Sequence, residues 1–113
     1  MSVSHVTTHI LDTTAGRPAV GVAVVLEARD GDVWVQLGSG STDADGRVKE
    51  LGPERLASGA YRLRFDTGAY FAGINTDAFF PEVALTFAVD AEQAHYHVPL
   101  LLSPFAYSTY RGS

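Results

Sequence analysis

Residues 94–102 read Ala-His-Tyr-His-Val-Pro-Leu-Leu-Leu and have the two-residue period of a β-strand. One face of this strand is apolar and is predicted to pack into a core; it holds Tyr96, Val98, Leu100 and Leu102. The other face is mixed, with His95, His97, Pro99 and Leu101. We therefore expect the histidine-bearing face to point outward or towards another subunit.

Short apolar runs separated by turn residues extend in both directions from this strand. We predict a first strand that includes His5 and His9, followed by strands at residues 20–28, 33–37, 47–48, 60–65, 82–89, 94–102 and 105–111. Turns are expected at residues 30–32, 43–46 and 103–104, and residues 38–42 are expected to be small and flexible. One short helix is predicted within residues 66–75, where Asp66 can cap the first turn. Seven or eight strands with one brief helix indicate an all-β sandwich.

The composition fits one globular domain that spans residues 1–113. The chain has 113 residues, of which 46% are hydrophobic and 19% charged. It contains no cysteine, which excludes a disulfide scaffold, a thiolate nucleophile and any cysteine-based metal site. The formal net charge is −5 and the basic residues are scattered, so neither nucleic acid nor a membrane is expected as a partner. With no long apolar segment and no secretion-type start, we expect a cytoplasmic protein.

Three local segments fall short of known functional motifs. The segment from Ser41 to Gly46 resembles the start of a calcium loop, but Gly52 occupies the position of the bidentate glutamate. Residues 38–40 lack the Lys-Ser/Thr pair of a phosphate loop, and no Gly-x-Ser-x-Gly elbow is present. These segments are interpreted as turns and connections.

The four histidines are the main candidates for chemistry. His5 and His9 share one face of the first strand, and His95 and His97 share one face of the penultimate strand. From the residues alone, the His-x-His pair fits a solvated face, a structural hydrogen-bonded pair, or two of three zinc ligands. The spacing does not decide between these interpretations.

A longer pattern narrows the choice. Residues 95–113, His-Tyr-His-Val-Pro-Leu-Leu-Leu-Ser-Pro-Phe-Ala-Tyr-Ser-Thr-Tyr-Arg-Gly-Ser, closely resemble the end of the transthyretin-related 5-hydroxyisourate hydrolases. Residues 6–19 and 42–47 resemble that family's first strand and a later turn, so the likeness covers nearly the whole chain. The most specific part is the final tetrapeptide, residues 110–113, which the family's enzymes share and the hormone carrier transthyretin lacks.

This resemblance implies a fold, a reaction and a set of residues. The fold would be a transthyretin-like sandwich of two four-stranded sheets with a short helix after the fifth strand. The reaction would be hydrolysis of 5-hydroxyisourate to 2-oxo-4-hydroxy-4-carboxy-5-ureidoimidazoline, without metal or cofactor. The implied catalytic residues are His9, Arg47 and His97. The implied substrate-binding residues are Ser108, Tyr110, Arg111, Gly112 and Ser113.

The resemblance also implies a homotetramer, a dimer of dimers with the sites in a channel between the dimers. On this interpretation His97 and His9 orient and deprotonate a water molecule, while Arg47 binds the substrate and stabilises the oxyanion. Arg47 should also favour the neutral form of both histidines. The role of His95 is left open.

Three alternatives remain at this point. A transthyretin-type carrier would need apolar or long side chains at the positions of His9, Arg47 and His97. A structural β-sandwich would not need three polar groups that converge at one subunit boundary. A zinc-dependent hydrolase would use His9, His95 and His97 as ligands.

Overall fold

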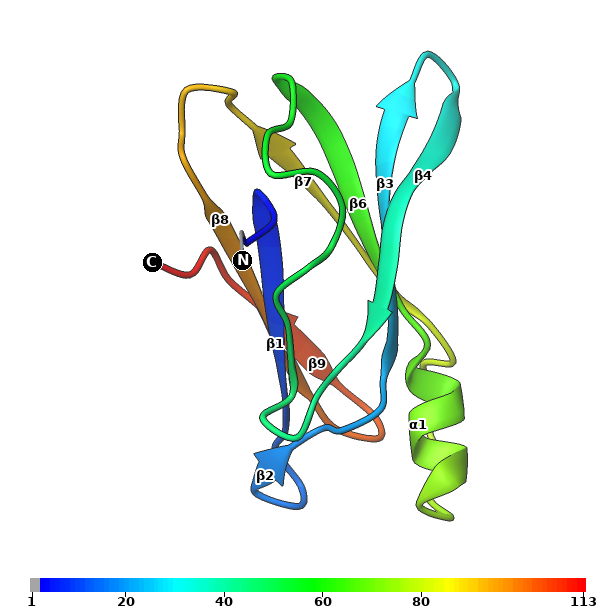
Figure 1. Cartoon of the computed structure of the whole chain (residues 1–113). Coiled ribbons are helices and arrows are strands. Elements are labelled where there is room, and N and C mark those ends of the chain that lie inside the picture. The colour runs from blue at the N-terminus through cyan, green and yellow to red at the C-terminus, as the bar shows by residue number, and fades with distance from the viewer. Residues whose placement is uncertain (1–2) are drawn as a thin grey trace.

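Two β-sheets face each other and enclose the core (Figure 1). The computed structural model describes residues 3–113. The first sheet contains β1 (Val6–Asp12), β2 (Arg17–Pro18), β5 (Arg47–Val48), β8 (Tyr96–Leu102) and β9 (Tyr107–Thr109). Its order is β2-β1-β8-β9, and β5 also pairs with β1. Strands β1 and β8 run parallel, whereas the other pairs are antiparallel.

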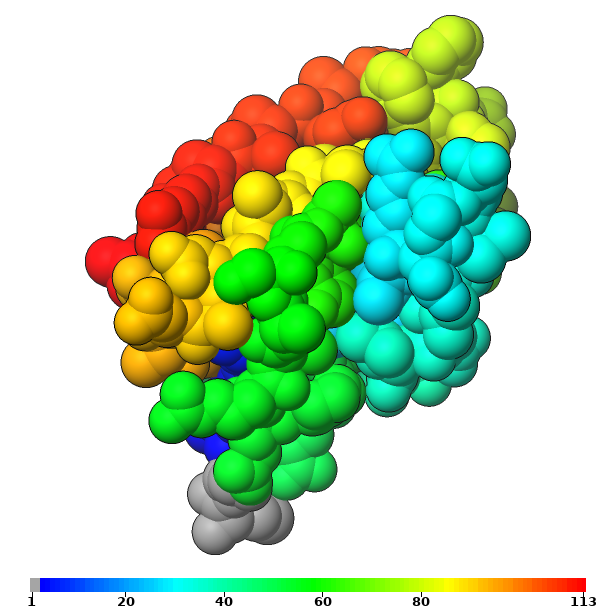
Figure 2. All heavy atoms as spheres, turned by 90° about the horizontal axis from the view of Figure 1, so that it is seen from above, coloured from blue at the N-terminus to red at the C-terminus, as the bar shows by residue number. Residues whose placement is uncertain are grey.

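The second sheet is antiparallel throughout. It contains β3 (Ala23–Asp30), β4 (Val33–Ser41), β6 (Gly59–Phe65) and β7 (Val83–Val89), in the order β4-β3-β6-β7. The β3–β4 hairpin turns at Gly31, whose φ of 63° suits a residue without a side chain. In the view from above, β4 (cyan) and the C-terminal segment (red) lie at opposite sides of the molecule (Figure 2).

The core lies between the two sheets and is supplied by alternate residues of nearly every long strand. Val6 and Ile10 of β1, Leu26 of β3 and Leu63 of β6 are fully buried. The apolar face predicted for residues 96–102 is confirmed, because all four of its side chains are buried. The other face of this strand therefore lies on the outer surface of the first sheet.

The single helix, α1 (Thr67–Gly73), begins where the sequence predicts. Asp66 is its N-cap, and its carboxylate accepts a hydrogen bond from the Ala69 amide at 3.1 Å. The Tyr70 hydroxyl donates to Asp12 Oδ2 at 2.7 Å and so ties the helix to the end of β1. Burial and the neighbouring Asp12 carboxylate raise the pKa of Tyr70 to about 12.

The all-β transthyretin-like class is confirmed, but four local expectations need correction. The first sheet has a fifth strand, β2, which pairs with β1. The strand predicted at residues 20–28 begins only at Ala23, because Gly21 has a φ of 79° and donates its amide to Thr42. The two terminal strands are shorter than expected. The first begins at Val6, so the buried His5 lies outside it, and the last is confined to Tyr107–Thr109 rather than residues 105–111.

The fourth correction concerns residues 38–41, which extend β4 instead of forming a flexible segment. A Cβ at Gly38 would lie 2.6 Å from the Gly52 amide nitrogen, and one at Gly40 would lie 2.9 Å from the Val48 side chain. The small residues therefore allow β5 and the segment after it to pack closely on β4.

Candidate active site

The outer face of the first sheet brings the three predicted catalytic residues together. His9 of β1 is paired with Arg47 of β5, and Thr7, two residues earlier in β1, is paired with His97 of β8. Directly paired residues project to the same face with Cβ atoms roughly 5 Å apart, and diagonal neighbours roughly 7–8 Å apart. His9, Arg47 and His97 thus lie on one surface, although 88 residues separate the two histidines in the chain.

A tight turn sets the position of Arg47. The Asp43 carboxylate accepts hydrogen bonds from the amides of Asp45 at 2.9 Å and Arg47 at 3.0 Å. The bond from the Arg47 amide is the main reason that the pKa of Asp43 is lowered. At Gly46, with φ of 75°, a Cβ would lie 2.5 Å from the Ile10 carbonyl oxygen. The turn therefore needs glycine here to place Arg47 beside β1.

The electrostatic surroundings favour a neutral His97. Burial lowers its pKa, and the nearby charges of Arg47, His9 and His95 lower it further. A histidine with a lowered pKa is uncharged at neutral pH and can accept a proton. His97 therefore has the protonation state that a general base requires.

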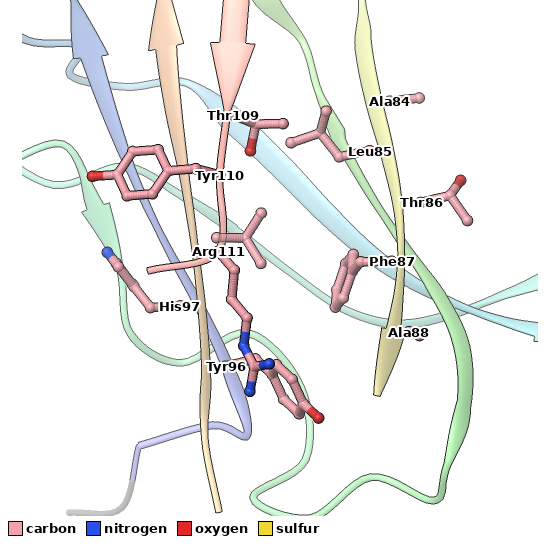
Figure 3. Close-up of a pocket in the computed structure, with 11 residues that line it drawn as sticks. Ala84, Leu85, Thr86, Phe87, Ala88, Tyr96, His97, Thr109, Tyr110 and Arg111 are labelled. Carbon is pink, nitrogen blue, oxygen red and sulfur yellow. The ribbon is translucent and has the colours of Figure 1, made fainter. Parts of the chain in front are cut away.

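The C-terminal tail lies directly beside His97. The Gly112 amide donates to the His97 carbonyl oxygen at 2.8 Å. A Cβ at Gly112 would lie 2.7 Å from His97 Cδ2, so the backbone can lie this close to the ring only because residue 112 is glycine. Tyr110 projects to the same side of β8 as His97, as Figure 3 shows.

The other tail residues are placed differently. The Arg111 guanidinium carbon lies 4.9 Å from the centre of the Tyr96 ring, on the opposite side of β8 from the His97 side chain (Figure 3). Ser108 is paired with Leu101 and is exposed, and Ser113 is exposed as well. Within this single chain, Tyr110 and Gly112 are therefore beside His97, whereas the Arg111 side chain points away from it.

A cavity of about 490 Å³ lies at the open edge of the sandwich, between β7 and the strands β8 and β9 (Figure 3). Its lining consists of Ala84, Leu85, Thr86, Phe87, Ala88, Tyr96, His97, Val98, Thr109, Tyr110 and Arg111. His9 and Arg47 do not line it, and Arg47 instead borders a separate, more open groove beside β5. The cavity therefore shares His97 with the sheet face that holds His9 and Arg47, but it does not include those two residues.

Thr7 is the site residue that the sequence analysis missed. Its hydroxyl lies 3.0 Å from His95 Nε2 and 3.0 Å from His97 Nδ1. The sequence offered one indication of its role: Thr7 precedes His9 by two residues, so the two side chains lie on the same face of the strand. Threonine is common in strands, so this signal is weak without the register between β1 and β8.

The structural arrangement bears directly on the zinc alternative. The Thr7 hydroxyl occupies one ring nitrogen each of His95 and His97, so these two nitrogens are directed at an oxygen. Across residues 3–113, no group of three or more histidine, aspartate or glutamate side chains could hold a metal ion. The interpretation of the His-x-His pair as a hydrogen-bonded pair therefore agrees with the geometry.

In the described part of the chain, no helix has the length and apolar character needed to cross a bilayer.

The chain as a whole is similar to proteins of a known family. The sequence model of the HIUase/Transthyretin family matches residues 6–112. A 5-hydroxyisourate hydrolase of Salmonella dublin is 54% identical over 106 residues, which cover 93% of this chain and 78% of that protein.

Two solved structures have the same fold. The 5-hydroxyisourate hydrolase of Klebsiella pneumoniae has a TM-score of 0.85 at 38% identity, covering 97% of this chain and 100% of that one. Sea bream transthyretin, solved in complex with thyroxine, has a TM-score of 0.90 at 35% identity, covering 96% and 94%. The chain belongs to the HIUase/Transthyretin family.

Proposed function

We propose that this protein hydrolyses 5-hydroxyisourate to 2-oxo-4-hydroxy-4-carboxy-5-ureidoimidazoline, a step of urate degradation. The observation that carries the proposal is the meeting of His9, Arg47 and His97 on neighbouring strands of one sheet face. The high identity to proteins named 5-hydroxyisourate hydrolase supports the same reaction. Cytoplasmic location stays a prediction of the sequence.

The reaction adds water to a ring carbonyl carbon and breaks the adjacent C–N bond. His97 and His9 orient the water, and a neutral imidazole takes its proton as the new C–O bond forms. That proton then passes to the ring nitrogen as it leaves. A correctly placed general base of this kind typically contributes about 10²–10⁴-fold to the rate.

Arg47 has a separate role in this scheme. Its guanidinium is planar and permanently charged, which suits it to hold the amide edge of the substrate and to offset the negative charge that develops on oxygen. Burial is the main cause of the lowered pKa of His97, and the charge of Arg47 lowers this pKa further. The Arg47 side chain thus both binds the substrate and helps to keep the His97 base in its neutral form.

We assign substrate binding to Ser108, Tyr110, Arg111, Gly112 and Ser113. Tyr110 and Gly112 already adjoin His97 in the single chain. The Arg111 side chain would have to turn from Tyr96 to reach the catalytic face, or act on a site that another subunit completes. This requirement supports a site at a subunit boundary.

We propose a homotetramer built as a dimer of dimers. Strands β7 and β9 are the edges of their sheets on the same side of the sandwich, with no further strand beside either one within residues 3–113. Unpaired edges and the open cavity between them favour pairing with a second copy. Exposed aromatic side chains near this edge, including Phe105 and Tyr107, add apolar surface.

The oligomer proposal is tested by analytical ultracentrifugation. The expected species has about four times the chain mass of 12.1 kDa. A monomer as the main species at micromolar concentration would contradict the proposal, whatever the enzymatic activity.

The likeness to a thyroxine-bound transthyretin keeps the carrier alternative open to experiment. Three polar groups on the sheet face are poorly suited to a bulky apolar ligand, because burying them without matched partners is unfavourable. A carrier would bind such a ligand and would not accelerate ring opening.

The deciding experiment mixes the protein with freshly prepared 5-hydroxyisourate and follows the loss of ultraviolet absorbance against the spontaneous rate. We expect strong acceleration, with kcat/KM reduced by about 10²-fold or more in His97→Asn and in Arg47→Ala. Arg29→Ala, an exposed arginine of β3, is the matched control and should keep wild-type activity. No acceleration by the wild-type protein, or full activity in both site variants, would contradict the proposed function.

A further inference from the structure

We propose that Thr7 is a positioning residue that joins His95 and His97 in one hydrogen-bond chain, sets the tautomer of His97 and gives its proton a path to His95. The inference deepens the proposed function, because it rests on His97 acting as the base. It also gives a role to His95, which the sequence analysis left open.

The geometry of the hydroxyl restricts the arrangement of protons. Thr7 Oγ1 lies 3.0 Å from both His95 Nε2 and His97 Nδ1. Thr7 is only 7% exposed, and its hydroxyl makes no other side-chain hydrogen bond within residues 3–113. A hydroxyl has a single proton to donate. The arrangement that satisfies all three groups has one ring donating to Thr7 and the other accepting from it.

The order of donors and acceptors in this hydrogen-bond chain follows from the need of His97 to accept a proton from water. His97 Nδ1 is directed at Thr7, so only His97 Nε2 is left to take a proton from water. A free lone pair on Nε2 of a neutral ring requires the hydrogen on Nδ1. His97 Nδ1–H therefore donates to Thr7, and the Thr7 O–H donates to His95 Nε2.

The same hydrogen-bond chain can carry the positive charge away from His97 after it accepts a proton. When water attacks the carbonyl carbon, its proton binds His97 Nε2. The hydrogen on His97 Nδ1 then passes to Thr7 Oγ1, and the Thr7 hydrogen passes to His95 Nε2. The positive charge ends on His95 while Thr7 and His97 are neutral again. The reverse transfer returns a hydrogen to His97 Nδ1, and the proton on His97 Nε2 then passes to the leaving nitrogen.

The charges around the two rings favour this transfer. His97 faces Arg47 from β5 and His9 from β1, and Tyr110 of the tail lies on the same side. Arg47 is level with His9 in the sheet, whereas His95 precedes Tyr96 at the far end of the β1–β8 ladder. A cation on His95 is therefore farther from Arg47 than one on His97.

The test uses Thr7→Val, which keeps the shape of the side chain without the hydroxyl, and Thr7→Ser, which keeps the hydroxyl. Nitrogen-15 NMR of the histidine rings reports the tautomer of His97 directly. We expect the Nδ1–H form in the wild type and in Thr7→Ser, and a mixture or the Nε2–H form in Thr7→Val.

Kinetic measurements then test whether the hydrogen-bond chain from His97 through Thr7 to His95 contributes to the reaction. We expect kcat of Thr7→Val to fall at least about tenfold with KM within about twofold, and Thr7→Ser to recover most of the loss. His95→Leu leaves Thr7 in place and should also lower kcat, which keeps the proposal testable if Thr7→Val does not fold.

Unchanged kcat in Thr7→Val, or in His95→Leu if Thr7→Val does not fold, overturns the proposal. An unchanged His97 tautomer in Thr7→Val overturns it too. Full activity in His97→Asn would instead defeat the catalytic role assigned to His97. The tautomer measurement needs no turnover, so the two failures are distinguishable.

Discussion

At the scale of single residues, His97 is the side chain whose surroundings are most specialised. Its Nδ1 contacts the Thr7 hydroxyl and its ring lies close beside the Gly112 backbone. The nearby charge of Arg47 also lowers its pKa, in addition to burial. Each of these contacts constrains a different property: the tautomer, the ring position and the protonation state. Separate substitutions should therefore change these properties one at a time.

The charge of Arg47 should be measurable at His97. Burial is the largest cause of the lowered pKa of His97 and Arg47 is the next, so Arg47→Gln should raise that pKa without restoring its ordinary value. The sign follows because a nearby cation disfavours the imidazolium form. NMR titration of the His97 ring checks this without any need for activity. Arg29→Gln is the control, and an equal pKa of His97 in Arg47→Gln and wild type would refute the assignment.

The close packing of Gly112 predicts a specific defect. In Gly112→Ala the new Cβ would begin 2.7 Å from His97 Cδ2, so the ring or the tail must shift. We expect kcat/KM to fall about tenfold or more, since a displacement of about 1 Å at a catalytic group has effects of this order. The Tm should change little because the tail is near the surface.

Gly59→Ala provides the matched comparison for that variant. A Cβ at Gly59 would have no neighbour within 4 Å, and Gly59 is exposed at the start of β6. Its activity should equal that of the wild type. If both glycine variants retain full activity, the tail does not position His97.

At the scale of elements, an ionic cluster holds the outer face of the second sheet. Glu27 of β3 is 7% exposed, and its Oε1 accepts hydrogen bonds from Arg62 Nε at 2.7 Å and Arg64 Nε at 3.0 Å. Arg62 also lies over the Trp34 ring of β4, 4.4 Å from its centre. The cluster thus connects β4, β3 and β6.

Replacement of Glu27 should destabilise the fold in a pH-dependent way. Burial by itself raises the pKa of Glu27, but the hydrogen bonds and charges of Arg62 and Arg64 together outweigh burial, so the net pKa lies below the ordinary 4.5. The ionised form therefore stabilises the fold above that value, and the contribution is lost as pH falls through the lowered pKa. Urea unfolding of Glu27→Gln at pH 7 should show a loss of about 1–2 kcal/mol that shrinks in acid.

Glu82→Gln is the control, because Glu82 lies just before β7 and also contacts Arg64. Glu82 is half exposed and meets Arg64 only at 3.4 Å, so its removal should change the free energy of unfolding by less than about 0.5 kcal/mol. If the two variants lose the same free energy of unfolding, the buried position of Glu27 does not strengthen its ion pairs.

At the scale of the whole molecule, the stability of the sandwich should not depend on the C-terminal tail, whereas the activity should. The tail beyond Tyr110 is held by one backbone bond to His97 and by the Arg111–Tyr96 contact. A chain ending at Tyr110 should lose about 1 kcal/mol or less of stability while its kcat/KM falls about tenfold or more. Thermal melting and steady-state kinetics measure the two effects, and Ser113→Ala at full length is the control. Loss of folding together with activity would show that the tail is part of the core.

The sequence alone determined the features that depend on near neighbours in the chain. Alternation along residues 94–102 identified the buried and outward faces, and Asp66 marked the start of the helix. The resemblance to one family, carried by residues 6–19, 42–47 and 95–113, supplied His9, Arg47 and His97, and their placement on one face agrees with it.

The tertiary structure decided what depends on contacts between distant segments. Thr7 bridges two histidines that lie 88 and 90 residues further along the chain, and only the register of β1 against β8 brings them together. The same holds for Gly38 against Gly52 and for the turn of Arg111 towards Tyr96. Local periodicity shows which face a side chain occupies, but the neighbour it meets there is set by strand order and register, which only packing of the whole chain selects.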